Sequence, residues 1–140
     1  MYAFLAPLGR TLALSALLLA GNVAAAEIWI VTDTRHPVAG AQAADRVIQL
    51  DAAQTIEADL SAGLPTDPQQ AAALIQRRLN DGGRGLQQRI REAYQGVADA
   101  WSLGITSIPA VIVDQRYVVY GVNNLDQALA RIERQRGAQP

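Results

Sequence analysis

The sequence predicts an α/β domain, a mixed sheet with helices on both of its faces, and three observations support this. A run of β-branched and aromatic residues, EIWIV, occupies residues 27–31. Two further runs, AVIVD at residues 110–114 and YVVYG at residues 117–121, follow each other closely. Segments in which apolar residues recur at helical spacing separate the first run from the last two. Strands interleaved with helices in this way are typical of the α/β class.

The composition indicates one globular domain without thiol chemistry. The chain has 140 residues, of which half are hydrophobic, 12 are basic and 13 are acidic, and it contains no cysteine. A nearly neutral charge argues against a protein that coats nucleic acid, because that task requires an excess of cations. Without cysteine there is no disulfide exchange, no thiolate nucleophile and no thiolate metal site. We expect no metal and no cofactor.

The first 26 residues have the pattern of a signal peptide. Arg10 precedes the apolar residues 12–20, and the small residues 24–26 end the segment. The apolar run is shorter than the roughly 20 residues that a membrane-spanning helix needs. We predict cleavage after Ala26, an exported periplasmic protein and a single domain over residues 27–140; the alternative is an uncleaved membrane anchor.

The elements after the first strand follow from local signals. Residues 32–37 read as a loop, residues 38–44 as a helix and residues 46–51 as a short strand. Two helices come next, separated by the sequence DGGRG at residues 81–85. Asp67 is placed to cap the first of them, with a proline after it. The positions expected to form the apolar sides of these helices are Ala72, Ile75, Leu79, Leu86, Ile90, Ala93, Val97 and Trp101. The aromatic residues expected in the core and at its rim are Tyr94, Trp101, Tyr117 and Tyr120.

The segment GITSIPAVIVDQRYVVYG, residues 104–121, predicts a helix end, a strand, a turn and a second strand. Asn124 is placed to cap a last helix after it. Pro109 stands at the head of the first of these strands, although proline cannot donate to a sheet ladder. We predict a cis Ile108–Pro109 peptide bond; the alternative is a trans proline that only begins the strand.

This order of elements resembles a thioredoxin-like fold with a helical insertion before a cis-proline hairpin. In that fold the backbone before the proline stays exposed beside the loop after the first strand, where an extended peptide can pair with it. The sequence VTDTRHPVA, residues 31–39, is similar to that loop in periplasmic thiol isomerases, with His36 and Ala39 where the cysteines would stand. The resemblance therefore implies a partner-binding groove. Its predicted residues are Thr34, Arg35, His36 and Pro37 on one wall and Ser107, Ile108 and Pro109 on the other.

His36 is the only histidine, and it raises the question of catalysis. At the start of a helix its charged form would be disfavoured by the helix dipole, which suits a neutral hydrogen-bonding group. The hydroxyls of Thr34 and Ser107 lack a supporting motif for a nucleophile. We expect no catalytic residue, with a His36-dependent enzyme as an alternative.

Five arginines are concentrated on the two predicted helices and form a possible basic interaction face. They could bind an acidic partner surface or lipid headgroups, or they form a solvated helix face. These residues are Arg77, Arg78, Arg84, Arg89 and Arg91.

Three segments resemble a particular family: LSAGLPTDPQQAA at residues 60–72, AYQGVADAWSLGITSIPAVIVD at residues 93–114 and VVYGV at residues 118–122. They are similar to integrating conjugative element proteins of unknown function, which are related in style to TrbC and TraW-type components of conjugative type IV secretion. The resemblance implies a non-catalytic, periplasmic protein-interaction component. Its expected partners are other proteins of the conjugation apparatus, and no nucleic acid. An alternative is a periplasmic chaperone for secretion or pilus subunits.

Overall fold

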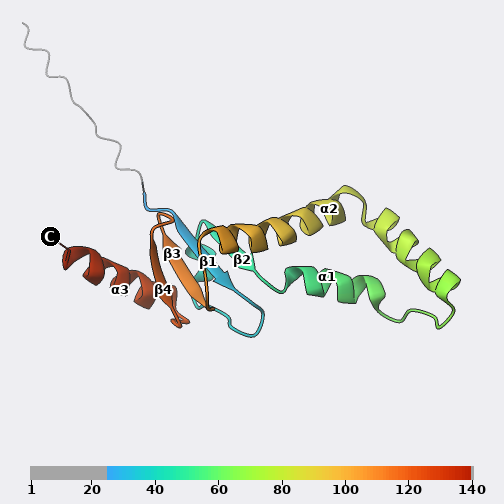
Figure 1. Ribbon diagram of the computed structural model, residues 1–140, viewed down its shortest axis with the longest axis horizontal. Coiled ribbons are helices and arrows are strands. Elements are labelled where there is room, and N and C mark those ends of the chain that lie inside the picture. The colour runs from blue at the N-terminus through green and yellow to red at the C-terminus, as the bar shows by residue number, and fades with distance from the viewer. Residues whose placement is uncertain (1–24, 140) are drawn as a thin grey trace, which may run out of the picture.

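The computed structural model describes residues 25–139, which form a four-stranded mixed sheet with helices on both faces (Figure 1). The predicted signal peptide lies outside the described residues, apart from its last two positions. The strands are β1 (Ile28–Thr32), β2 (Arg46–Gln49), β3 (Ala110–Val113) and β4 (Tyr117–Tyr120). Their order is β2-β1-β3-β4, in which β1 is parallel to β2 and antiparallel to β3, and β3 is antiparallel to β4. The predicted α/β class is confirmed.

Each face of the sheet carries its own apolar cluster, because successive side chains of a strand point to opposite faces. Ile30 faces helix α3 (Leu125–Gly137) and packs with Leu125. Val31 faces the long helix α2 (Pro68–Ser102) and packs with Ala100. The core therefore consists of two layers, one on each side of β1 and β3.

The caps and the break predicted for the helices are present. The Asp67 side chain accepts the backbone N–H of Gln70 at 3.0 Å, and Asn124 caps α3 through the N–H of Gln127 in the same way. Helix α2 is interrupted at Gly83, where φ is 54° and ψ is −145°, a conformation that suits glycine because it lacks a Cβ atom. The sequence DGGRG thus separates two helical segments, as predicted.

The second half of α2 turns small residues toward the sheet. The buried positions are Ala93, Gly96 and Ala100. A Cβ atom on Gly96 would lie 2.9 Å from Cγ2 of Ile48, so the helix approaches β2 too closely for larger side chains. Val97 and Trp101 consequently point outward, with 42% and 85% of their surface exposed, and Tyr94 is 56% exposed. Val97 and Trp101 were expected on the apolar side of the helix, and Tyr94 and Trp101 in the core or at its rim, but none of the three is buried.

The predicted helix at residues 38–44 was also wrong. Ala39 lies extended beside Asn124, and its N–H donates to the carbonyl of Asn123 at 2.8 Å while its carbonyl accepts the N–H of Leu125 at 2.9 Å. Only a short 3₁₀ turn, η1 (Ala41–Ala43), follows. Ala39 is extended because its backbone groups bond to the start of α3, and the hydrogen bonds within the segment, such as that from Ala44 N–H to the carbonyl of Ala41, form only the 3₁₀ turn.

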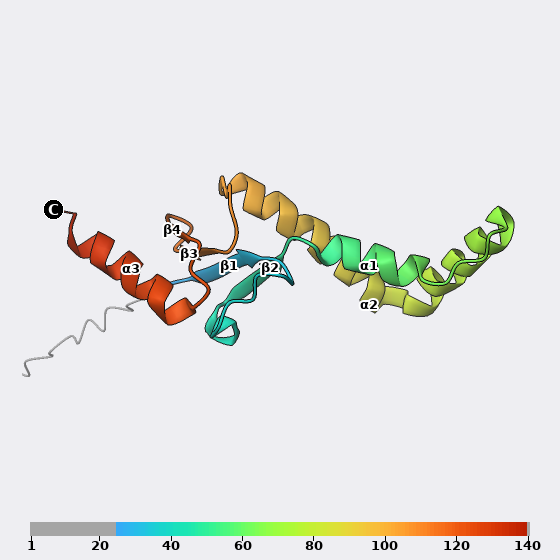
Figure 2. The ribbon, with the colours of Figure 1, turned by 90° about the horizontal axis from the view of Figure 1, so that it is seen from below.

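Helix α1 (Ala52–Ser61) was not predicted, and it forms an arm together with α2. Figures 1 and 2 show α1 and the second half of α2 running side by side away from the sheet, with the first half of α2 at the far end. Ile56 of α1 is buried, and Arg78 donates to the carbonyl of Leu60 at 2.8 Å. No helix within residues 25–139 combines the length and the apolar character needed to cross a membrane.

Candidate partner-binding site

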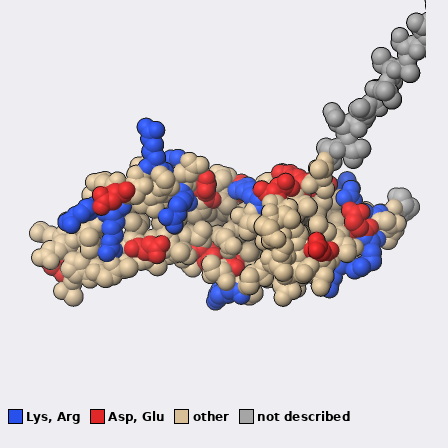
Figure 3. Space-filling view, turned by 180° about the vertical axis from the view of Figure 1, so that it is seen from behind, with Lys and Arg blue, Asp and Glu red and all other residues tan. Residues whose placement is uncertain are grey.

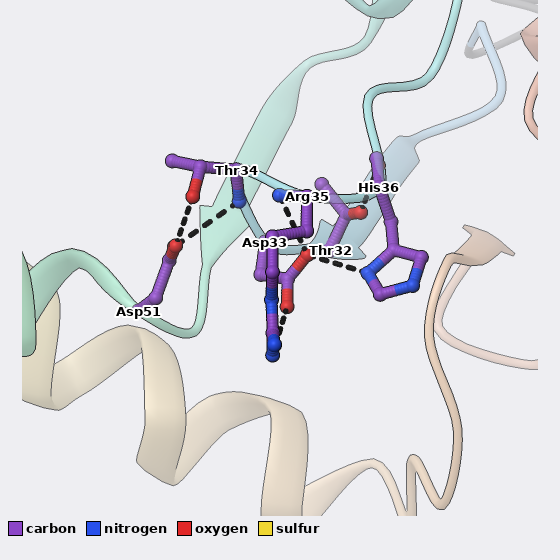
Figure 4. A network of polar contacts seen from close by, with 6 residues as sticks. All are labelled: Thr32, Asp33, Thr34, Arg35, His36 and Asp51. Carbon is purple, nitrogen blue, oxygen red and sulfur yellow. Dashed lines mark hydrogen bonds and ion pairs between the residues drawn. The ribbon is translucent and has the colours of Figure 1, made fainter.

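The loop after β1 is organised by Asp33, a carboxylate that is only 5% exposed (Figure 4). One oxygen of Asp33 accepts the N–H of Arg35 at 3.0 Å and lies 2.6 Å from Nδ1 of His36. The other oxygen lies 3.4 Å from the Arg35 guanidinium. Thr32 closes the loop by donating its hydroxyl to the carbonyl of His36. Because no α-helix follows this loop, His36 does not occupy the predicted helix N-terminus.

The same contacts keep Asp33 ionised and fix the imidazole of His36. The hydrogen bond from His36 is the main cause that lowers the pKa of Asp33, while burial opposes it less strongly. With Nδ1 engaged, the other ring nitrogen of His36 is left for other contacts, and 47% of this side chain is exposed. The arrangement is an oriented aspartate–histidine pair.

Stability is expected to fall in acid because of Asp33. Its pKa is lowered on folding, so its contribution is fully present above the unfolded value of 3.8 and is lost as the pH falls through the lower folded value. Urea unfolding at pH 7 and below pH 4 measures the loss. Asp33→Asn should make this loss of stability in acid smaller, with Asp51 and Asp99 still contributing because their pKa values are also lowered. Asp59→Asn, on the exposed side of α1, should keep the wild-type profile. A loss of stability in acid that is unchanged in Asp33→Asn would contradict the assignment.

The Ile108–Pro109 peptide bond is cis, as predicted. Val31 pairs with Ala110, so this corner and the loop after β1 lie at the same end of the sheet. The carbonyl of Pro109 accepts the N–H of Gly121 at 2.9 Å. Among the described residues, the backbone N–H groups of Ser107 and Ile108 have no hydrogen-bond partner. The corner therefore presents free backbone donors at the end of the sheet.

An apolar cavity of about 260 Å³ lies beside this corner. Trp101, with 85% of its surface exposed, forms part of its wall together with residues of the segment before Pro109. The residues that line the cavity are Leu50, Val97, Ala100, Trp101, Ile105, Thr106, Ser107 and Ile108. Exposed apolar surface next to unpaired backbone donors is suited to binding an extended peptide segment.

The predicted groove residues are distributed over several environments. Ser107 and Ile108 line the apolar cavity, whereas Thr34 lines another cavity, beside Asp51. Neither of these two cavities is lined by the remaining loop residues, which are Arg35, His36 and Pro37. Pro109 itself is buried. The sequence analysis missed Asp33, which sets the loop shape, and the exposure of Trp101; the spacing of Asp33 and Arg35, typical of an Asx turn, could have indicated the first.

The five arginines do not share one environment. Arg78 is half-buried and bonds to the carbonyl of Leu60, so it has a structural contact inside the arm. The other four are exposed. Figure 3 shows basic and acidic side chains mixed along the face of the arm that it displays. Within residues 25–139, no group of three or more histidine, aspartate or glutamate side chains could hold a metal ion.

Comparison with family models places these features in a wider group. The model for a family described as "Protein of unknown function (DUF1525)" matches residues 25–138. The chain belongs to this family. The DUF1525 match extends from before β1 into the last residues after α3, so it includes the loop after β1, the arm and the cis-proline corner. The chain matches no curated protein and no solved structure.

Proposed function

We propose that the chain is a non-catalytic protein-interaction component built on a thioredoxin-like scaffold that has no thiols. The strand order β2-β1-β3-β4, with helices on both faces and a cis proline before β3, supports the thioredoxin-like assignment. The observation that carries the binding function is the apolar cavity beside Ile108, with the exposed indole of Trp101 in its wall. Function depends on such a site and not on the fold alone.

In this proposal, an extended segment of a partner protein pairs its backbone with the N–H groups of Ser107 and Ile108. An apolar side chain of that segment enters the cavity and packs against Trp101. Tryptophans in such positions are often interface hot spots, whose truncation costs about 2 kcal/mol or more of binding free energy. The loop with Arg35 and His36 lies at the same end of the sheet and supplies polar contacts at the margin.

The partner, in our proposal, is a protein of a conjugative type IV secretion apparatus. The resemblance of three sequence segments to integrating conjugative element proteins supports this assignment, and the signal peptide pattern supports export to the periplasm. The protein would assist assembly or function of the mating-pair apparatus there.

Replacing Trp101 with alanine is expected to lower the conjugative transfer frequency of the host element at least tenfold, in a strain that lacks the wild-type gene. Because Trp101 is 85% exposed, its loss should leave the fold intact, which a thermal melt of the purified variant checks. Tyr94→Ala is the matched control, since Tyr94 is an exposed aromatic residue of α2 that does not line this cavity. Wild-type transfer by the Trp101→Ala variant would contradict the proposed binding site.

The aspartate–histidine pair favours a second candidate function, an enzyme that uses His36 as a general base. Nδ1 of His36 lies 2.6 Å from Asp33, which orients the ring as a supporting carboxylate does in catalytic triads. A His36→Ala variant that loses function while keeping its fold and its partner binding would favour this candidate. A variant that keeps function would exclude it.

The exposed aromatic residues favour a third candidate, a periplasmic chaperone for secretion or pilus subunits. Tyr94 and Trp101 offer apolar surface on α2 that could contact many unfolded clients. Capture of many unfolded chains, instead of one stoichiometric partner, would distinguish this candidate from the first.

A further inference from the structure

A second cavity, of about 370 Å³, lies where the arm joins the edge strand β2. Val47 and Ile48 of β2, Ile56 of α1 and Ala93 of α2 give it an apolar wall. Asp51, at the start of α1, supplies a carboxylate to the same cavity. None of its lining residues belongs to the apolar cavity beside Ile108, so the two sites are separate.

Only one of the two Asp51 carboxylate oxygens has hydrogen-bond partners among the described residues. Oδ2 accepts both the N–H of Thr34, at 3.1 Å, and the hydroxyl of Thr34. Oδ1 is shielded from solvent and has no hydrogen-bond partner among the described residues. The bonds from Thr34 lower the pKa of Asp51, so the group carries its charge at neutral pH. Figure 4 shows Asp51 on one side of the loop, beside Thr34, and His36 on the other side, where its ring contacts Asp33.

No cation of the described residues neutralises Asp51. Arg89 and Glu92 line the same cavity, but no ion pair joins Asp51 to Arg89 or to another described basic side chain within 4.0 Å. Asp33 raises the pKa of Asp51 as a nearby like charge does, but this is the smallest of the contributions, and the bonds from Thr34 outweigh it. A charged carboxylate without a cationic partner in a largely apolar cavity is costly, and a donor that carries a positive charge offsets that cost best.

We propose that this cavity receives a lysine or arginine side chain from an extended segment of a partner protein that lies along β2. The charged head would lie against the Asp51 carboxylate in the cavity wall, while the aliphatic stem would pack on the apolar residues, as long basic side chains do. β2 is an edge strand of the described sheet, so one side of its backbone is left for a partner's extended segment. The inference goes beyond the binding proposed at Ile108, because it assigns a different surface and a charge requirement.

A peptide titration tests the inference on the ¹⁵N-labelled chain. The probe is the capped tripeptide acetyl-Val-Arg-Val-amide, and the control probe is acetyl-Val-Gln-Val-amide, which has no charge. We expect saturable shifts of the Thr34, Gln49 and Ala93 amides with the arginine peptide and at least tenfold weaker binding of the glutamine peptide. Equal binding of the two peptides, or no saturable shift, would overturn the proposal.

Variants test whether binding of the arginine peptide depends on Asp51. Asp51→Asn should weaken binding of the arginine peptide at least tenfold, whereas Asp59→Asn, an exposed carboxylate of α1 outside the cavity, should not. If Asp51→Asn does not fold, Arg89→Glu at the exposed margin should tighten binding severalfold, and unchanged affinity in that variant would count against the site. Trp101→Ala should leave the titration unchanged, so this inference and the proposed function can fail separately.

Discussion

Replacing Gly96 with valine is expected to destabilise the domain by about 1–3 kcal/mol, the usual cost of overpacking a close-packed core. A Cβ atom at this position would lie 2.9 Å from Cγ2 of Ile48, which is itself only 3% exposed. Helix α2 would have to move away from β2, and the contact of Ala100 with the sheet would loosen with it. Urea unfolding followed by far-ultraviolet circular dichroism measures the loss.

Gly85 offers the matched control on the same helix. A Cβ atom there would meet nothing within 4 Å, and Gly85 has no positive φ. Gly85→Ala should therefore stabilise the chain by about 0.5–1 kcal/mol, because alanine favours a helix more than glycine does. Equal stability of Gly96→Val and the wild type would show that α2 does not pack on β2 as described.

Replacing Leu125 with alanine is expected to cost about 2–5 kcal/mol, as for other fully buried leucines. Leu125 is 1% exposed and belongs to the cluster that includes Ile30 and Val111. Within residues 25–139, α3 is the only α-helix packed on this face, so little else can fill the space that the leucine leaves. Thermal and urea unfolding of the variant give the cost.

Leu129 provides the comparison within α3. It is only partly buried against the same cluster, so Leu129→Ala should cost clearly less than Leu125→Ala. Similar costs for both variants would mean that α3 is docked in a different rotation about its axis. The pair therefore tests the orientation of the helix as well as its contribution to stability.

The elements that the sequence predicted well are those with local signals. Asp67 and Asn124 cap helices through their own side chains, and Gly83 adopts a backbone conformation that suits glycine. Pro109 indicated the corner before β3, because a proline that begins an inner strand needs a special backbone geometry. Such signals depend on a few neighbouring residues, so a single sequence is sufficient to find them.

The elements that were missed or wrong depend on distant partners. The extended conformation of Ala39 is set by bonds to Asn123 and Leu125, more than 80 residues away along the chain. The orientation of α2 follows from a close approach at Gly96, which turns Trp101 outward although its spacing is that of a core residue. Helical periodicity shows which side chains share a face, but not which face meets the sheet.

The sequence predicted the position of the candidate site but not its cavities. The sequence placed the loop after β1 and the corner before Pro109 at one end of the sheet, which the pairing of Val31 with Ala110 confirms. It could not indicate the two cavities, because each is lined by residues from distant segments. It also gave no reason to single out Asp51, whose unpartnered oxygen only the folded chain produces.

The break at Gly83 has a dynamic consequence. The helical segment before it lies at the far end of the arm, away from both apolar clusters of the sheet (Figure 1). Its attachment includes the hydrogen bond from Arg78 to Leu60, which is a contact within the arm. Backbone amides of this segment should exchange with deuterium through local opening, well before those of β1 and β3, which exchange through global unfolding. We therefore expect the tip of the arm to open locally while the sheet stays folded.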